Sequence, residues 1–212
     1  MRHKPDRKCL TRCARVILGI ALLALRIYAR AAQAPAQANP GEITLNVDTA
    51  QSKIHWTLGS TLHTVHGTFN VKRGSLTFDP TSGKASGEIV AYATSGESGN
   101  DSRDKKMHKE ILESEKFPDV IFRPDKVEGK LVGQGSCSVQ VHGTFVLHGA
   151  EHELTAPVHA ELGRDHWKGT TKFSVPYIQW GLKSPNTFLL KADPAVEIEL
   201  DMSGALQVAA AQ

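Results

Sequence analysis

Apolar and polar residues alternate in many short segments, and this feature most constrains the fold. Ile54, Trp56 and Leu58 fall on one face of an extended segment, with His55 and Thr57 on the other. Segment after segment repeats the pattern between turns rich in Gly, Pro and Asp. Because successive side chains of a strand point to opposite faces, this period of two predicts an antiparallel all-β protein with one face inward.

One segment, residues 101–113, breaks the alternation and is rich in helix formers. Asn100 precedes it as a candidate cap, and Met107 and Ile111 form a narrow apolar stripe at i,i+4 spacing. We therefore expect a single short helix inserted between two strands. The number of alternating segments fits a β-sandwich or a closed barrel of eight strands, and alternation alone does not separate the two.

The N-terminal region differs sharply from the rest of the chain. Residues 1–31 hold eight basic residues and one acidic residue, whereas residues 32–212 hold 17 basic and 21 acidic ones. The basic start, a short apolar run at 16–25 and the small residues that follow are typical of a secretory signal peptide. The apolar run is shorter than the roughly 20 residues that span a bilayer.

These features predict the domain organisation and the location. We expect a signal peptide at 1–31 with cleavage between 31 and 38, a linker at 32–42, a folded domain at 43–203 and a flexible tail at 204–212. The mature protein would be periplasmic or secreted, and its mildly acidic body argues against nucleic acid as a partner. Only Cys137 would remain, and its parity with Val139 predicts a buried, inert thiol.

Several motifs, taken in order, resemble one family. These are LNVD at 45–48, TVHGTF at 64–69, RDKKMH at 103–108, KFPDVIF at 116–122, GTFVLHG at 143–149 and the Trp180-Gly181 pair. The chain is similar to the YceI-like family of secreted, lipocalin-like proteins that bind polyisoprenoids and related amphiphilic lipids. The resemblance implies an eight-stranded antiparallel lipocalin-like barrel with a hydrophobic tunnel, often dimeric. Its cargo would be a quinone-like isoprenoid or a fatty amide or acid.

The inward-facing residues, read with this resemblance, give the expected binding site. Aromatic and aliphatic walls suit a long apolar tail, and the helix stripe and the 188–190 loop could close the mouth or merely pack on the sheet. The expected lipid contacts are Trp56, Phe69, Phe78, Met107, Ile111, Phe122, Phe145, Phe173, Trp180 and Phe188. The expected polar head-group contacts are Asp104, His108 and Tyr177.

Two other functions stay open at this point. The first is a secreted interaction or structural module with a filled core, whose 188–190 loop contacts a partner protein or a second copy. The second is a His-rich metal binder, although pairs such as His63 and His66 are spaced poorly for chelation on a strand. We expect no catalytic role, because Gly96-Glu97-Ser98-Gly99 lacks the spacing of a nucleophile elbow. The expected partner is an amphiphilic lipid, and no other cofactor is expected. A second copy of the chain, in a homodimer, and a transient contact with a membrane are further expected partners.

Overall fold

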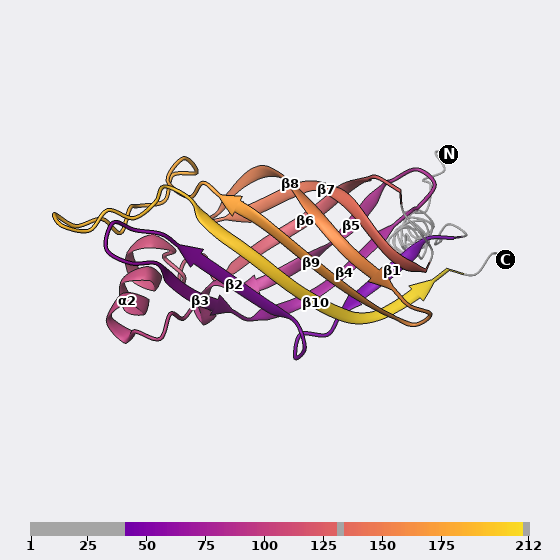
Figure 1. The fold of residues 1–212 in the computed structure, drawn as a ribbon, viewed down its shortest axis with the longest axis horizontal. Helices are drawn as coiled ribbons and strands as arrows, with labels where there is room; N and C mark the ends of the chain where they lie inside the picture. Colours follow the sequence, from indigo (N-terminus) through magenta and orange to yellow (C-terminus); the bar gives the residue numbers. More distant parts are fainter. Residues whose placement is uncertain (1–40, 131–133, 210–212) are drawn as a thin grey trace, which may run out of the picture. The chain divides into compact units, whose positions relative to one another are not determined.

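The structure is a computed structural model that describes residues 41–130 and 134–209 (Figure 1). The expected signal peptide and nearly all of the linker lie outside these residues. The described part forms one antiparallel sheet. Its strands are β1 (Ile43–Val47), β2 (Lys53–Leu58), β3 (Val65–Phe69), β4 (Val71–Phe78), β5 (Ala85–Tyr92), β6 (Asp119–Glu128), β7 (Gly135–Leu147), β8 (Ala150–Leu162), β9 (His166–Val175) and β10 (Val196–Val208).

The sheet closes on itself because β1 pairs with strands on both sides. Ile43 lies opposite Phe78 of β4 and opposite Val208 of β10. The strands therefore follow the circular order β1-β4-β5-β6-β7-β8-β9-β10. The prediction of a closed, eight-stranded antiparallel barrel is confirmed, and the β-sandwich is excluded.

Two further strands arise because two positions in the barrel wall are interrupted. β2 continues the path of β1 along β10, with residues 48–52 looping out opposite Met202 and Ser203 of β10. β3 pairs with β2 and runs into β4 through the single residue Asn70. The eight positions of the barrel are thus built from ten strand segments.

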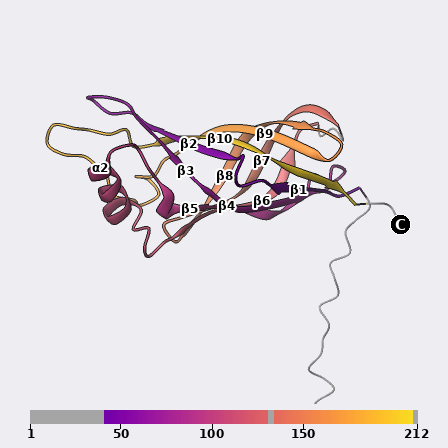
Figure 2. The same ribbon diagram turned by 90° about the horizontal axis from the view of Figure 1, so that it is seen from below.

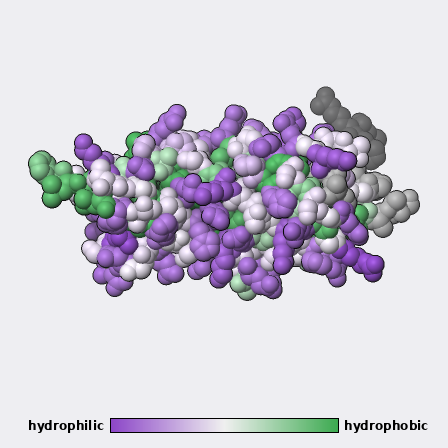
Figure 3. All heavy atoms as spheres, in the orientation of Figure 1, coloured by the Kyte–Doolittle hydropathy of each residue, from purple (hydrophilic) through white to green (hydrophobic). Residues whose placement is uncertain are grey.

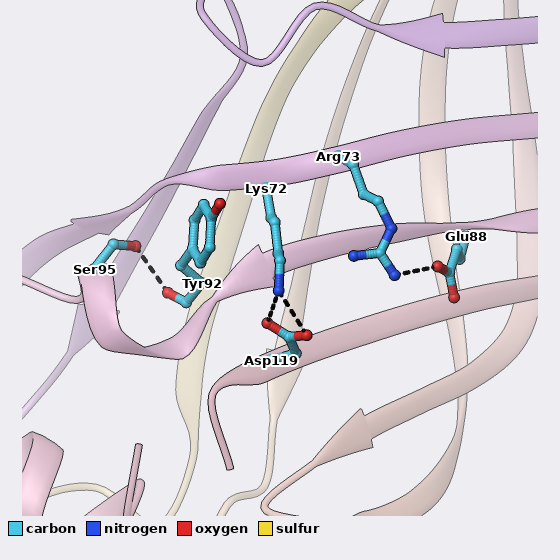
Figure 4. A network of polar contacts seen from close by, with 6 residues as sticks. All are labelled: Lys72, Arg73, Glu88, Tyr92, Ser95 and Asp119. Atoms are coloured by element: carbon cyan, nitrogen blue, oxygen red, sulfur yellow. Dashed lines mark hydrogen bonds and ion pairs between the residues drawn. The ribbon is translucent and has the colours of Figure 1, made fainter. Parts of the chain in front are cut away.

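The interruption at Asn70 is held by a short 3-10 helix, η1 (Ala93–Ser95). The backbone N–H of Asn70 donates to Ser95 Oγ at 2.8 Å, and Ser95 Oγ donates to the carbonyl of Tyr92 at 2.8 Å (Figure 4). The backbone N–H of Tyr92 in turn donates to the carbonyl of Asn70 at 3.0 Å. These bonds tie the bend of the wall to the segment that leads into the helix.

Ion pairs follow the outer face of β4, β5 and β6 beside this bend (Figure 4). Lys72 Nζ lies 2.9 Å from Asp119 Oδ1, and Arg73 Nη2 lies 2.6 Å from Glu88 Oε1. Their side chains are a quarter to half exposed, so each pair contributes at most about 1 kcal/mol. Charged groups here keep the outer face polar, as the alternation requires.

The predicted helix between strands is confirmed as α2 (Asp101–Lys106), which continues as one wider π turn, η2 (Met107–Ile111). Asn100 caps it, since its side-chain oxygen accepts a 3.0 Å bond from the backbone N–H of Arg103. None of the helices in the described part of the chain is long and apolar enough to cross a membrane.

The expected tail boundary at residue 204 is wrong. β10 continues to Val208, and residues 204–208 pair with β1. A Cβ atom at Gly204 would lie 1.8 Å from the carbonyl oxygen of Asn46, so the close approach of the two strands requires glycine. In the sequence, the apolar–polar alternation stops at Gly204, which is why the sequence predicts the end of the strand there.

Candidate functional site

The barrel encloses a cavity of about 620 Å³ with a wall that is almost entirely apolar. Every strand of the barrel contributes to the wall, because the inward parity of each strand is apolar. The six aromatic residues expected to point inward all line the cavity: Trp56, Phe69, Phe78, Phe122, Phe145 and Phe173. Met107 and Ile111 of the π turn η2 also line it. The interior is therefore hollow rather than filled by its own side chains.

Trp56 is accommodated by a glycine on the neighbouring strand. It lies opposite Gly67 of β3, where a Cβ atom would come within 2.4 Å of the indole ring. A larger residue in place of Gly67 would therefore clash with the indole ring of Trp56. Trp56 is only 6% exposed, and its indole nitrogen has no hydrogen-bond partner among the described residues.

One end of the cavity, which we call the packed end, is formed by closely packed buried side chains. Its residues are Ile43, Leu162, Trp167, Met202 and Leu206, all at most 6% exposed. Trp167 Nε1 donates to the backbone carbonyl of Asn46 at 3.2 Å, so this indole is fully satisfied. Cys137, a free and buried thiol as predicted, lines the cavity on β7 toward the same end.

The opposite end, which we call the mouth, carries the polar part of the wall. Figure 2 shows α2, the turn between β2 and β3, and the segment after β9 together at this end. The mouth is lined by Ser60, His63, Asn100, Ser102, Arg103, Lys106, Pro185, Thr187 and Leu190. Arg103 and Lys106 carry positive charge, and no Asp or Glu occurs among the residues that line the cavity. The mouth therefore offers hydrogen-bond donors and positive charge.

Hydrogen bonds join the segments of the mouth to one another. Lys106 Nζ donates to the carbonyl of Pro185 at 3.2 Å, which links α2 to the segment after β9. The backbone N–H of Thr61 donates to the carbonyl of Lys191 at 2.9 Å, and the N–H of Lys191 donates to Thr61 Oγ1 at 3.2 Å. The backbone N–H of Asp193 also donates to the carbonyl of Gly59 at 2.9 Å, so the two loops are joined by a short run of bonds, in contrast to the continuous ladders of the barrel.

Arg103 is held in place by Ser98, which precedes the helix. Arg103 Nε donates to Ser98 Oγ at 2.7 Å, and Nη2 donates to the Ser98 carbonyl at 3.0 Å. The carboxylate of Asp104 accepts bonds from the Ser98 backbone N–H, at 3.1 Å, and from its hydroxyl. Burial acts to raise the pKa of Asp104, but these bonds and the charge of Arg103 outweigh it and lower the pKa below its usual value.

The three residues predicted to contact a head group differ in whether they reach the cavity. Asp104 and His108 do not line the cavity. His108 Nε2 lies 2.8 Å from the carbonyl of Gly96 and must donate to it, so Nδ1 faces the Ser114 hydroxyl at 3.1 Å as an acceptor in the neutral ring. Both residues therefore anchor the helix.

Tyr177 does line the cavity, but its hydroxyl is already engaged. It donates to the backbone carbonyl of Asp193 at 2.9 Å. Burial, with the negative charge of Asp193, raises the pKa of the Tyr177 phenol, which keeps it protonated as a donor. Among the predicted polar contacts, only this one reaches the cavity.

Two of the predicted lipid contacts lie outside the cavity wall. Trp180 stacks on His152 with ring centroids 4.1 Å apart and an interplanar angle of 4°. Phe188 is 98% exposed and lies within the segment that connects β9 to β10. Its neighbour Leu190 does reach the wall.

The polar residues of the mouth were not found by sequence reasoning. They lie on turns and on α2, where the two-residue parity does not apply. The one available signal was their position, since Arg103 and Lys106 sit on the only predicted helix. As for metal binding, no three His, Cys, Asp or Glu side chains within residues 41–130 and 134–209 are grouped so that they could hold an ion.

Comparison with known structures finds the same fold in other proteins, among them the following two. BcnA of Burkholderia cenocepacia superposes with a TM-score of 0.62 at 15% identity, covering 74% of this chain and 99% of that one. A polyisoprenoid-binding domain from Saccharophagus degradans, implicated in plant cell wall breakdown, superposes with a TM-score of 0.56 at 13% identity. That match covers 81% of this chain and 100% of that one. At these identities the likeness shows a shared fold.

Sequence comparison gives the family. No curated protein matches the chain. The family model of the YceI-like domain matches residues 45–204, which span the barrel from β1 to β10. Since this match covers most of the chain, the protein belongs to the YceI-like domain family.

Proposed function

We propose that this protein binds an amphiphilic long-chain lipid outside the cytoplasm, without catalysing a reaction on it. The cavity of about 620 Å³ carries the proposal, because a closed β-barrel does not need empty space for its stability. Ligand sites usually measure about 300–1,000 Å³ and combine apolar walls with a few polar groups. The volume also argues against the alternative of a module with a filled core.

The apolar wall is suited to the tail of the lipid. Removing apolar surface from water stabilises a complex by about 25 cal/mol per Å², and a flexible chain can follow the cavity along the barrel. The described relative from Saccharophagus degradans is a polyisoprenoid-binding domain. We infer the same broad class of tail here: a polyisoprenoid, a quinone-like isoprenoid, or a fatty amide or acid.

The mouth is suited to the head group. Arg103 and Lys106 supply donors and positive charge, and the lining contains no carboxylate that would repel an acceptor. A carbonyl, carboxylate or phosphate would be favoured there over an ammonium group. We therefore place the head group at the mouth and the tail toward the packed end.

Filling the cavity tests the proposal. Ala156 lines the cavity on β8, whereas Ala205 is exposed on the outer face of β10. Ala156→Phe should weaken the binding of geranylgeraniol or hexadecanoic acid at least about tenfold, and Ala205→Phe should leave it unchanged. Binding can be followed by the fluorescence of Trp56 and Trp167, which line the cavity. Equal affinity in both variants would place the lipid elsewhere.

Extraction provides a second test that needs no chosen probe. The protein purified from cells should yield one amphiphile per barrel on organic extraction and mass spectrometry. The Ala156→Phe variant should yield much less. Recovery of no stoichiometric amphiphile from several expression hosts would contradict the proposal.

A further inference from the structure

We propose that the mouth docks on the surface of an anionic lipid bilayer, with Phe188 and Leu189 entering the boundary between head groups and acyl chains. This interaction goes beyond the binding of a single lipid in the cavity. It assigns a role to side chains that the cavity does not use.

Exposed apolar side chains gather at the mouth. Phe188 is 98% exposed, Leu189 is 76% exposed and Leu62 is 65% exposed. They lie on the two loops that Thr61 and Lys191 join by hydrogen bonds. Figure 3 shows hydrophobic residues protruding at this end of the barrel, beyond a surface that is mostly polar. Exposing such side chains to water is unfavourable, and exposed apolar side chains that gather in one place usually mark a contact surface.

Positive charge surrounds these apolar residues. The loop that carries Phe188 and Leu189, residues 183–192, holds Lys183 and Lys191 and no Asp or Glu. Arg103 and Lys106 line the mouth beside it, and Lys106 Nζ donates to the carbonyl of Pro185 in the same loop. The positive charge next to the apolar side chains would attract anionic lipid head groups.

This combination favours a bilayer over other occupants. A second copy docking through the same face would bring positive charge against positive charge. The apolar residues form a projecting tip rather than a concave pocket, which is how interfacial anchors enter a membrane. Leu190 lines the cavity while its neighbour Leu189 projects outward, so docking would set the cavity mouth against the lipid surface.

Vesicle binding tests the apolar tip. The full chain should co-sediment with vesicles of 70% phosphatidylcholine and 30% phosphatidylglycerol. The double substitution Phe188→Ser and Leu189→Ser should lower the partition coefficient about 100-fold, since two large apolar side chains leave the bilayer. Val208, 55% exposed at the far end of β10, provides the control, and Val208→Ser should change nothing.

A loop-specific signal separates the tip from the apolar residues 16–25. Phe188→Trp should add fluorescence that brominated lipids quench, whereas Val208→Trp should not be quenched. Lys183→Gln with Lys191→Gln should weaken partitioning about five-fold per lysine, and only on anionic vesicles at low salt.

Three results would overturn the proposal. The first is equal partitioning of the wild type and the serine variant, and the second is an unquenched Trp at position 188. The third is a dimer, seen by sedimentation velocity, that the serine substitutions abolish while vesicles bind neither protein. Geranylgeraniol binding in solution should be unchanged in the serine variant, so failure of docking is distinguishable from failure of lipid binding in the cavity.

Discussion

The two ends of the barrel are built from different interactions. At the packed end, Trp167 and Leu206 are at most 5% exposed, and β1 pairs with strands on both sides. At the mouth, the chain leaves the sheet, and hydrogen bonds such as that from Lys106 to Pro185 join the loops and the helix. This end has its own buried cluster, formed by Leu147, Val175, Tyr177 and Leu182, but the loops above the cluster are exposed and lie outside the continuous ladders of the barrel.

This difference separates the part of the barrel that sets its stability from the part that admits a ligand. Local opening follows regions with few buried apolar contacts and exposed backbone hydrogen bonds. We expect the mouth to open without unfolding the barrel, so that a lipid can enter while the packed end stays intact. Substitutions at the packed end should lower the free energy of unfolding, and those at the mouth should change rates of ligand exchange.

The largest expected effect compares two tryptophans. Trp167→Ala should lower the free energy of unfolding by about 3–5 kcal/mol, because it removes a buried ring and its bond to Asn46. Trp180→Ala removes a half-buried ring stacked on His152 and should cost about 1–2 kcal/mol. Urea denaturation gives both values. A greater cost for Trp180 would reverse the proposed assignment of stability.

A finer comparison uses the two buried indoles of the cavity wall. Trp56 and Trp167 are 6% and 5% exposed, but only Trp167 has a hydrogen-bond partner for its nitrogen. Substitution by Phe removes similar volume from each site. Trp167→Phe should therefore cost about 1 kcal/mol more than Trp56→Phe in the free energy of unfolding. Equal costs would mean that the bond to Asn46 adds nothing net.

At the mouth, Lys106→Met should act on kinetics. Losing the bond to Pro185 should speed dissociation of geranylgeraniol about 2–10-fold, with the free energy of unfolding changed by less than about 0.5 kcal/mol. Lys105→Met is the matched control, since Lys105 is exposed and does not line the cavity. Stopped-flow fluorescence measures the rate. A large loss of stability with no change in rate would place Lys106 in the core framework.

The smallest expected effect is a pH dependence that differs between the ends. The pKa of Asp104 is lowered in the folded protein, so its contribution is complete above the usual carboxyl pKa and is lost as pH falls through the lowered value. Ligand dissociation should therefore quicken at acidic pH, and Asp104→Asn should remove that dependence.

Asp79 serves as the control for this effect. The Ser82 hydroxyl and the Thr81 backbone N–H lower its pKa too, but it lies in the turn between β4 and β5, at the packed end. Asp79→Asn should leave the pH dependence of dissociation intact. If instead Asp79→Asn abolished it, the acid-sensitive contact would not be at the mouth.

The barrel wall could be predicted from sequence because its signal is local. Parity alone placed Trp56, Phe69 and Phe145 inward, and the resemblance carried by the motif order implied closure into eight strands. Parity failed at Gly204, where a close approach to Asn46 requires a residue without a side chain. It also could not show that β1 and β2 share one position in the wall, since that depends on pairing with β10, more than 100 residues away.

The mouth was harder to predict because its contacts join segments distant in sequence and lie outside regular strands. Asp104 and His108 belong to the helix, as expected, but their partners Ser98, Gly96 and Ser114 turn them into anchors. Ser60 and Thr187 line the mouth through turns whose course no periodicity specifies. Propensity placed the helix, whereas the direction of each polar side chain depends on tertiary contacts.

The position of Cys137 allows the length of a bound molecule to be measured. Its sulfhydryl faces the lumen on β7, well away from the entrance, and it is the sole thiol among the residues that the structure describes. A guest with a long chain should slow the alkylation of this buried thiol by a small reagent, while a short-chain guest should leave the rate as it is in the empty barrel. Peptide mapping separates it from Cys9 and Cys13, so the length of an occupying molecule can be measured without labelling that molecule.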